Sequence, residues 1–188
     1  MTVFRAAEAG DAEKRASRPG DELVAPADVV MDRAFTVQGP VEQVWPWLVQ
    51  LGKRRAGWYL PRTVERFLPS SRRGARRLET RWLGLRVGDV IPDYGGKNET
   101  FQVAEITPPT SLVYASRRGR TELTWSITLA PDGSSATRVA LRLRMAPVRH
   151  RLLARTAGEL LDLLTVAGLA AGLRERLAAA APETPERP

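Results

Sequence analysis

Two neighbouring stretches of the chain alternate apolar with polar residues, and this alternation constrains the fold more than any other feature of the sequence. In the first stretch, residues 121–129, the apolar positions are Leu123, Trp125, Ile127 and Leu129. In the second, residues 138–145, they are Val139, Leu141, Leu143 and Met145. A period of two is typical of a strand with one buried face, and the intervening Pro131-Asp132-Gly133 favours a turn. The pattern predicts an antiparallel hairpin with one dry and one wet face.

Glu122 and Arg142 fall on the faces that this alternation assigns to solvent. Opposite charges stabilise a pair of strands when they lie across from each other. We therefore expect a surface ion pair between these two residues, with no part in a functional site.

Shorter runs predict further strands earlier in the chain. Residues 32–37 form the first, which ends at Gly39-Pro40. The other candidates are residues 78–82, 86–91, 99–106 and 111–116. Pro108-Pro109 separates the last two, because proline cannot donate a hydrogen bond to a strand ladder. Together with the hairpin, these runs predict an antiparallel sheet.

Two short helices are expected after the first strand. From Val41 to Leu51 apolar residues recur at intervals of three and four, which is one face of a helix. Pro46 should kink or split this helix, because proline lacks the backbone donor, and Gly52 should end it. A second short helix is predicted over residues 62–67.

A long helix is predicted from Arg149 to about Ala180. One stripe of it is polar, at Arg151, Arg155, Glu159 and Asp162. The opposite stripe is apolar, at Leu153, Ala157, Leu160 and Leu164, and we expect it to pack on the sheet. Three glycines interrupt the helix, Gly158, Gly168 and Gly172. They indicate either close packing against the sheet or space left for another molecule.

The two ends of the chain differ from its middle. Residues 1–27 mix charge with alanine and glycine and lack the apolar run of a secretory signal, so we expect a flexible arm. Residues 182–188 are rich in proline and should form a disordered tail. A single domain is expected over residues 28–181. No uncharged apolar run reaches the roughly 18 residues of a membrane span, so no transmembrane segment is expected.

Composition excludes several kinds of chemistry. The sequence has no cysteine and one histidine, His150, which excludes disulfides, thiol nucleophiles and multi-histidine metal sites. We expect no metal and no cofactor. The net charge of +8 comes from 29 basic residues, all but three of them arginines. Because these arginines are scattered without an RNA-binding motif, nucleic acid is not the expected partner.

The order of elements over about residues 28–180 resembles the START-like superfamily, often called SRPBCC, which has the helix-grip fold. Gly57-Trp58-Tyr59 and Val87-Gly88-Asp89-Val90-Ile91-Pro92 are similar to a bacterial subgroup of it. The resemblance implies an α+β fold in which a curved antiparallel sheet wraps a long C-terminal helix and leaves an apolar cavity between them. The superfamily includes polyketide cyclases and dehydrases and lipid-transport proteins.

The resemblance also places aromatic residues at the walls or mouth of that cavity. They are Trp58, Tyr59, Trp82, Tyr94 and Trp125. We expect these residues to bind the ligand, with membership of an ordinary core as the alternative for each. Asp93 and Tyr94 precede Gly95-Gly96 and are the candidates for acid–base catalysis. Asp89 should bond its own turn, and His150 should lie at the surface.

Two functions fit these features. The first is a cytoplasmic protein, monomeric or weakly dimeric, that binds a small apolar or aromatic molecule such as a lipid or a polyketide. The second is an enzyme of the cyclase, aromatase or dehydratase type, in which a carboxyl or phenol in a dry pocket gains a suitable pKa. A third, weaker interpretation is a basic interaction protein with one contiguous arginine face.

Overall fold

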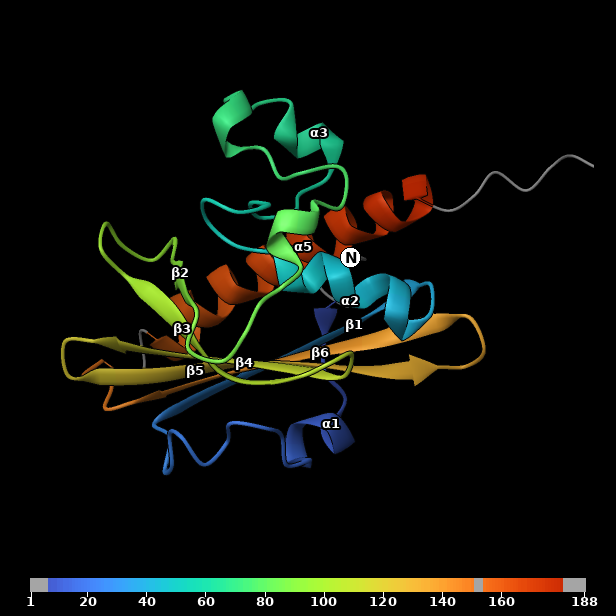
Figure 1. The fold of residues 1–188 in the computed structure, drawn as a ribbon. Helices are drawn as coiled ribbons and strands as arrows, with labels where there is room; N and C mark the ends of the chain where they lie inside the picture. Colours follow the sequence, from blue (N-terminus) through green and yellow to red (C-terminus); the bar gives the residue numbers. More distant parts are fainter. Residues whose placement is uncertain (1–6, 151–153, 181–188) are drawn as a thin grey trace, which may run out of the picture.

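The computed structural model describes residues 7–150 and 154–180, and it has an α+β fold built on a single six-stranded antiparallel sheet. The strand order is β1-β6-β5-β4-β3-β2. The curved sheet carries α2 and the long helix α5 on one face and α1 on the other (Figure 1). This arrangement confirms the predicted helix-grip class.

The strands are β1 (Val29–Gln38), β2 (Val90–Pro92), β3 (Thr100–Thr107), β4 (Ser111–Arg118), β5 (Thr121–Asp132) and β6 (Ala136–Ala146). The α-helices are α1 (Asp11–Arg15), α2 (Val41–Gln50), α3 (Arg62–Glu65) and α5 (Glu159–Ala180). The 3-10 turns are η2 (Ser70–Arg72) and η3 (Thr80–Trp82), and a π-helical turn, η4 (Ala154–Gly158), precedes α5.

The predicted hairpin is β5 and β6. Its register sets Trp125 opposite Leu143 and Ile127 opposite Leu141, so the apolar residues of both strands share the face beneath α2 and α5. On this face Ile127 and Leu141 are fully buried. The dry face of the hairpin is therefore the floor of the core, as the alternation predicted.

The predicted wet face of the hairpin is wrong in its central part, where Thr124, Ser126 and Arg142 are buried. The cause is the N-terminal segment, which lies across this face. Arg142, only 4% exposed, donates to carboxylate oxygens of Asp32 and Asp21 at 2.7 and 2.8 Å. It also donates to three backbone carbonyls of the segment, those of Glu13, Lys14 and Ala16.

The predicted pair between Glu122 and Arg142 is also wrong, because the register sets Arg142 opposite Ser126 and Glu122 opposite Ala146. Glu122 instead forms an exposed ion pair with Arg117 of β4 at 2.8 Å.

Residues 7–27, which we expected to form a flexible arm, are packed against the sheet. Ala7 and Ala9 are buried, Glu8 bridges to Arg33 of β1, and Glu13 pairs with Arg138 of β6 at 2.8 Å. A run of mixed charge is typical of a solvated arm, but here the charges complement arginines on the sheet. Residues 1–6 and the predicted tail at 182–188 lie outside the described residues.

The region from 78 to 91 departs from prediction, since only its last residues are in a strand, Val90–Pro92. Side chains from α2 and the following loop bind its backbone instead. Gln50 accepts from the Glu79 amide at 3.0 Å and donates to the Arg77 carbonyl at 3.3 Å, and Arg55 donates to the Trp82 carbonyl at 2.7 Å. These hydrogen bonds occupy backbone N–H and C=O groups that would otherwise bond to a neighbouring strand.

Of the kink or split expected at Pro46, the split does not occur, because α2 runs as one helix from Val41 to Gln50. Val44, Trp47 and Leu48 are buried beside this proline. Packing of one face into the core therefore outweighs the hydrogen bond that proline removes. The helix does end where expected, since Gly52 has a positive φ of 138°.

The sheet-facing side of α5 is not the predicted one. Leu160 and Leu164 are about half exposed, whereas Asp162 faces β1 and pairs with Arg33 at 2.9 Å. The buried residues lie further along, and include Val166, Leu169, Ala170, Leu173 and Leu177. The first part of the predicted helix, residues 151–153, lies outside the described residues.

Two of the three helix glycines allow close packing. A Cβ on Gly172 would lie 2.7 Å from backbone atoms of Tyr59 and Leu60, and one on Gly168 would lie 2.7 Å from Leu60 Cδ2. By length and composition alone, the helix from Thr156 to Ala180 could cross a membrane. In this fold the buried residues of α5, among them Leu169 and Leu173, belong to the hydrophobic core.

Candidate functional site

A cavity of about 560 Å³ lies between the sheet and the first turns of α5. The strands contribute Met31, Phe101, Tyr114, Leu123, Trp125 and Leu143 to its wall. From the helical side come Gly158, Leu161, Asp162 and Val166, and the loop after α2 adds Trp58. The lining is thus apolar with few polar groups, and the volume lies within the usual range of small-molecule sites.

Aromatic rings cluster around Trp125 on β5. Its ring stacks on Tyr114 of β4, with centroids 5.8 Å apart and planes 19° apart. Trp58 and Phe101 contact the same indole at centroid distances of 5.9 and 6.2 Å. Because the rings support one another, they form a fixed wall that offers large flat faces to an apolar or aromatic guest.

Trp58 joins this wall to α5, since its Nε1 donates to the carbonyl of Thr165 at 3.2 Å. Gly158 lies nearby on the helical side, and a Cβ there would be 3.2 Å from Met31 Cε. Of the three helix glycines, Gly158 is the one that lines the cavity. It therefore fits the second interpretation of these glycines, in which an absent side chain leaves space.

Asp162 is the acidic group on the helical side of the cavity. Its Oδ2 lies 2.9 Å from Arg33 Nε, and Arg33 also donates to the Glu159 carbonyl at 3.0 Å. Burial raises the pKa of the Asp162 carboxyl above its ordinary value, although the Arg33 guanidinium opposes this shift. Arg33 thus fastens the first turn of α5 to β1 beside the cavity.

A second polar cluster lines the cavity at the loop after β2. Asp93 forms an ion pair with Arg118 of β4, and Lys53 Nζ donates to the carbonyls of Asp93 and Gly96 at 2.7 and 3.2 Å. Tyr94 is 55% exposed, and partial burial raises the pKa of its phenol. These contacts tie the loop to its neighbours in the cavity lining.

The structure brings four of the residues singled out from the sequence to this cavity: Trp58, Asp93, Tyr94 and Trp125. Tyr59 lies elsewhere, fully buried in the core, where its hydroxyl donates to the Trp47 carbonyl at 2.8 Å and accepts from Gln50 Nε2 at 2.9 Å. Trp82 lies on η3, where its ring is flanked by the guanidinium groups of Arg55 and Arg81.

Sequence reasoning missed Phe101, Tyr114 and Asp162. No alternation singles out Tyr114, because Leu112, Val113 and Tyr114 are consecutive apolar residues and all three are buried. Burial also raises the pKa of the Tyr114 phenol above its ordinary value. No local pattern identifies Asp162, which falls on a stripe that the helix periodicity assigned to solvent.

The remaining candidates lie outside the cavity. Asp89 Oδ2 accepts from the Arg86 amide at 2.8 Å, which is the turn-stabilising role expected for it, and His150 is exposed. Within residues 7–150 and 154–180, no group of three or more histidines, cysteines or acidic residues is arranged to hold a metal ion.

The fold and the cavity together define an α+β protein of the helix-grip class. No family model matches the chain, and no curated protein matches it. Solved structures do match. Protein MLL2253 from Mesorhizobium loti is 15% identical, with a TM-score of 0.50, and 82% of this chain and 100% of that one are covered.

A protein from Rhodobacter sphaeroides is 16% identical, with a TM-score of 0.51 and coverage of 84% of this chain and 97% of that one. CalU16 from Micromonospora echinospora is 14% identical, with a TM-score of 0.45 and coverage of 80% and 84%. At such identities, a likeness to solved structures shows the fold and leaves the function to the site.

Proposed function

We propose that this chain is a START-like (SRPBCC) protein that binds a small hydrophobic molecule, such as a lipid, polyketide or aromatic compound, between the sheet and α5. The observation that carries the proposal is the 560 Å³ cavity with Trp58, Tyr114 and Trp125 in its wall. Apolar surface buried from water supplies the affinity, at roughly 25 cal/mol per Å². The few polar groups of the lining, among them Asp93 and Asp162, favour guests that carry one or two hydrogen-bonding groups.

The proposal is tested by filling the cavity. Leu143 lines it from β6, and Leu143→Trp adds volume there, whereas Leu143→Met keeps the volume nearly constant. The probe is 1-anilinonaphthalene-8-sulfonate, followed by its fluorescence, together with native mass spectrometry of freshly purified protein. We expect Leu143→Trp to weaken probe binding about tenfold or more and Leu143→Met to leave it within about threefold.

Equal probe affinity in wild type and Leu143→Trp would place the bound dye elsewhere. If native mass spectrometry also detected no copurified organic molecule, the binding function would be rejected.

A second candidate function, acid–base catalysis of the cyclase or dehydratase type, is favoured by Asp162. Asp162 lines the apolar cavity, and burial raises the pKa of its carboxyl, which favours a role as proton donor to the carbonyl oxygen of a bound guest. Asp93 and Tyr94, which also line the cavity, are the other candidates. The enzyme hypothesis predicts that Asp162→Asn abolishes deuterium exchange of a 1,3-dicarbonyl probe while dye binding persists. No exchange above the buffer rate in wild type would remove this candidate.

A further inference from the structure

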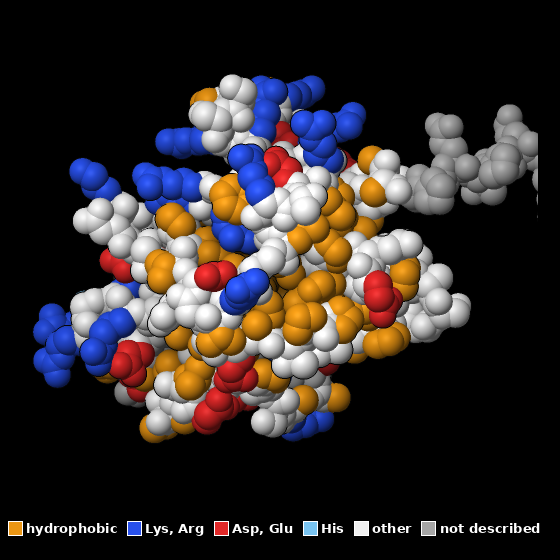
Figure 2. All heavy atoms as spheres, viewed as in Figure 1, with side chains coloured by type: hydrophobic (Ala, Val, Ile, Leu, Met, Phe, Trp, Pro, Cys, Tyr) orange, Lys and Arg blue, Asp and Glu red, His pale blue; other side chains and the backbone are white. Residues whose placement is uncertain are grey.

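A basic lobe stands on the far side of α2 and α5 from the sheet. It comprises residues 61–77, with α3 and η2, and lies at the top of Figure 1. The lobe projects away from the rest of the fold in Figure 1, and basic groups gather over it in Figure 2. The exposed arginines are Arg62, Arg66, Arg72, Arg73 and Arg77.

Apolar side chains are exposed among these arginines. Phe67 is 76% exposed, and Val64, one turn earlier, is 46% exposed. The Arg66 guanidinium lies 4.6 Å from the centroid of the Phe67 ring, so cation and apolar group form one unit at the surface. Exposed apolar groups ringed by cations are typical of interaction surfaces.

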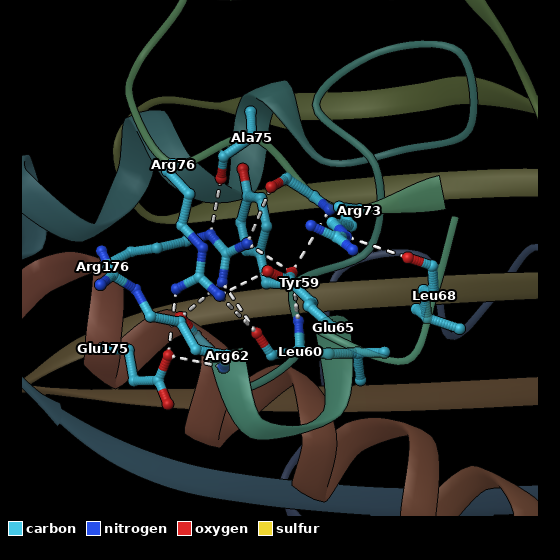
Figure 3. Close-up of polar contacts among 12 residues, drawn as sticks. Tyr59, Leu60, Arg62, Glu65, Leu68, Arg73, Ala75, Arg76, Glu175 and Arg176 are labelled. Carbon is cyan, nitrogen blue, oxygen red and sulfur yellow. Dashed lines mark hydrogen bonds and ion pairs between the residues drawn. The ribbon is translucent and has the colours of Figure 1, made fainter. Parts of the chain in front are cut away.

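The lobe is held rigidly, mainly by Arg176 of α5 (Figure 3). This side chain is 1% exposed. Its guanidinium donates to the carbonyls of Ala75 at 2.7 Å, Gly74 at 3.1 Å and Leu60 at 3.2 Å. The same group pairs with Glu65 Oε1 at 2.8 Å. The exposed side chains of the lobe are therefore presented on a fixed frame.

The acidic groups near the lobe are already neutralised. Glu65 is the only acidic residue in the segment 61–77, and it is buried between Arg176 and Arg76. Burial alone would raise the pKa of Glu65, but the two arginines lower it on balance, so it stays ionised. Glu175 of α5 pairs with Arg76 at 3.0 Å. The outer face of the lobe thus offers positive charge with no acidic side chain from its own segment.

We propose that the basic lobe docks the protein on an anionic phospholipid bilayer, with Phe67 and Val64 entering the interface and the exposed arginines contacting lipid phosphates. An anionic bilayer matches both features at once, because it offers a phosphate layer over an apolar interior. A nucleic acid matches the charge, but its outer surface is a charged sugar-phosphate backbone and not an apolar layer, and one face of Phe67 is already covered by Arg66. This inference is independent of whether the cavity is occupied.

The test uses the full chain and sedimentation with vesicles of phosphatidylcholine alone or mixed with phosphatidylglycerol. We expect binding to the mixed vesicles, weakening as salt rises, and little binding to phosphatidylcholine alone. Phe67→Ser should weaken binding about tenfold, and Arg72→Gln about fivefold. The matched controls are Val87→Ser and Arg120→Gln, which change an exposed valine and an exposed arginine outside the lobe and should bind as wild type does.

Thermal unfolding of each variant establishes that these exposed substitutions leave the fold intact. The proposal is overturned if wild type binds neither kind of vesicle, or if Phe67→Ser or Arg72→Gln binds as wild type does. It is likewise overturned if the control variants lose as much affinity as the lobe variants. Tighter binding to a DNA oligonucleotide than to the mixed vesicles, undiminished by Phe67→Ser, would assign the lobe to nucleic acid instead.

Discussion

Buried arginines are the residues on which this fold most depends. Arg142 and Arg176 are both almost inaccessible, and each guanidinium is surrounded by carboxylates and backbone carbonyls from segments far apart in sequence. Arginine suits this role because its planar group presents five donors in a fixed geometry and stays charged. These two arginines therefore have a structural role and contribute little to the surface charge.

Removing Arg176 should be strongly destabilising. Arg176→Met leaves Glu65 buried with Arg76 as its remaining cationic partner, and we expect a loss of about 3–5 kcal/mol in the free energy of unfolding. The double variant Arg176→Met, Glu65→Gln should recover part of that loss, because the unpaired charge is gone. Urea unfolding measures both. If the two variants were equally stable, the loss of stability would come from the lost hydrogen bonds of Arg176 to backbone carbonyls and not from the Glu65 carboxylate that has lost this partner.

At the scale of elements, glycines determine how closely α5 and the turn before it approach neighbouring parts of the fold. Gly172 meets the backbone at Tyr59 and Leu60, whereas Gly158 meets only the flexible end of Met31. Backbone cannot move aside without displacing the loop that leads into the basic lobe, but a methionine can adopt another rotamer. Gly172 lies within α5 and Gly158 at the end of the η4 turn before it, so the two glycines place different constraints on neighbouring parts of the chain.

These constraints predict that replacing glycine by alanine has a large effect on stability at Gly172 and a small effect at Gly158. Gly172→Ala should destabilise the protein by about 1–3 kcal/mol, because overpacking outweighs the gain in helix propensity. Gly158→Ala should change stability by less than about 1 kcal/mol and slightly reduce the cavity. Thermal and urea unfolding of the pair supply the comparison. If Gly172→Ala were neutral, the close approach of α5 to Leu60 would not be needed for the fold.

The sequence predicts a helix or strand correctly when the residues of that element alone determine its conformation and its buried face. The hairpin of β5 and β6 is such a case, because alternation fixes which residues face the core. The segment 78–91 is not, because the side chains that bind its backbone, Gln50 and Arg55, lie about 25 residues or more away in the sequence. The face of α5 was mispredicted because leucines lie on both of its sides, and contact with Arg33 orients Asp162 inward.

The candidate site likewise contains some residues that the sequence predicted correctly, while other predicted residues lie elsewhere in the fold. Trp58, Tyr94 and Trp125 were found because the resemblance places aromatic residues around a cavity, and Trp125 also lies on the dry face of the hairpin. Tyr59 and Trp82 carry the same kind of side chain but lie in the core and on η3. Only tertiary packing decides which aromatic residues reach the cavity, so composition and spacing cannot separate these two groups.

At the scale of the whole molecule, paired carboxylates fasten two peripheral segments to the sheet and to α5. Glu13 joins the N-terminal segment to β6, where hydrogen bonds from Arg138 lower the pKa of its carboxyl to about 2 against the opposing effect of burial. Glu65 joins the basic lobe to α5, and its pKa is also lowered. Both groups bind protons more weakly in the folded protein than in the unfolded chain.

Stability should therefore fall in acid. A carboxyl with a depressed pKa stabilises the fold fully above its unfolded value, near 4.5, and loses that contribution as the pH falls toward its folded value, about 2 for Glu13. Urea unfolding between pH 7 and pH 2.5 measures this loss. Glu13→Gln should remove about 1 kcal/mol at pH 7 and have less effect below pH 3. An equal effect of Glu13→Gln at both pH values would contradict the assignment.

The packing of Trp125 has a practical consequence. Indole emission responds to its surroundings, and among the five tryptophans only Trp58 and Trp125 line the cavity, while Trp45, Trp47 and Trp82 lie outside it. A guest that displaces water from these two rings would change their emission against a steady background from the other three. The protein thus carries its own optical reporter, with which libraries of unlabelled compounds can be screened directly.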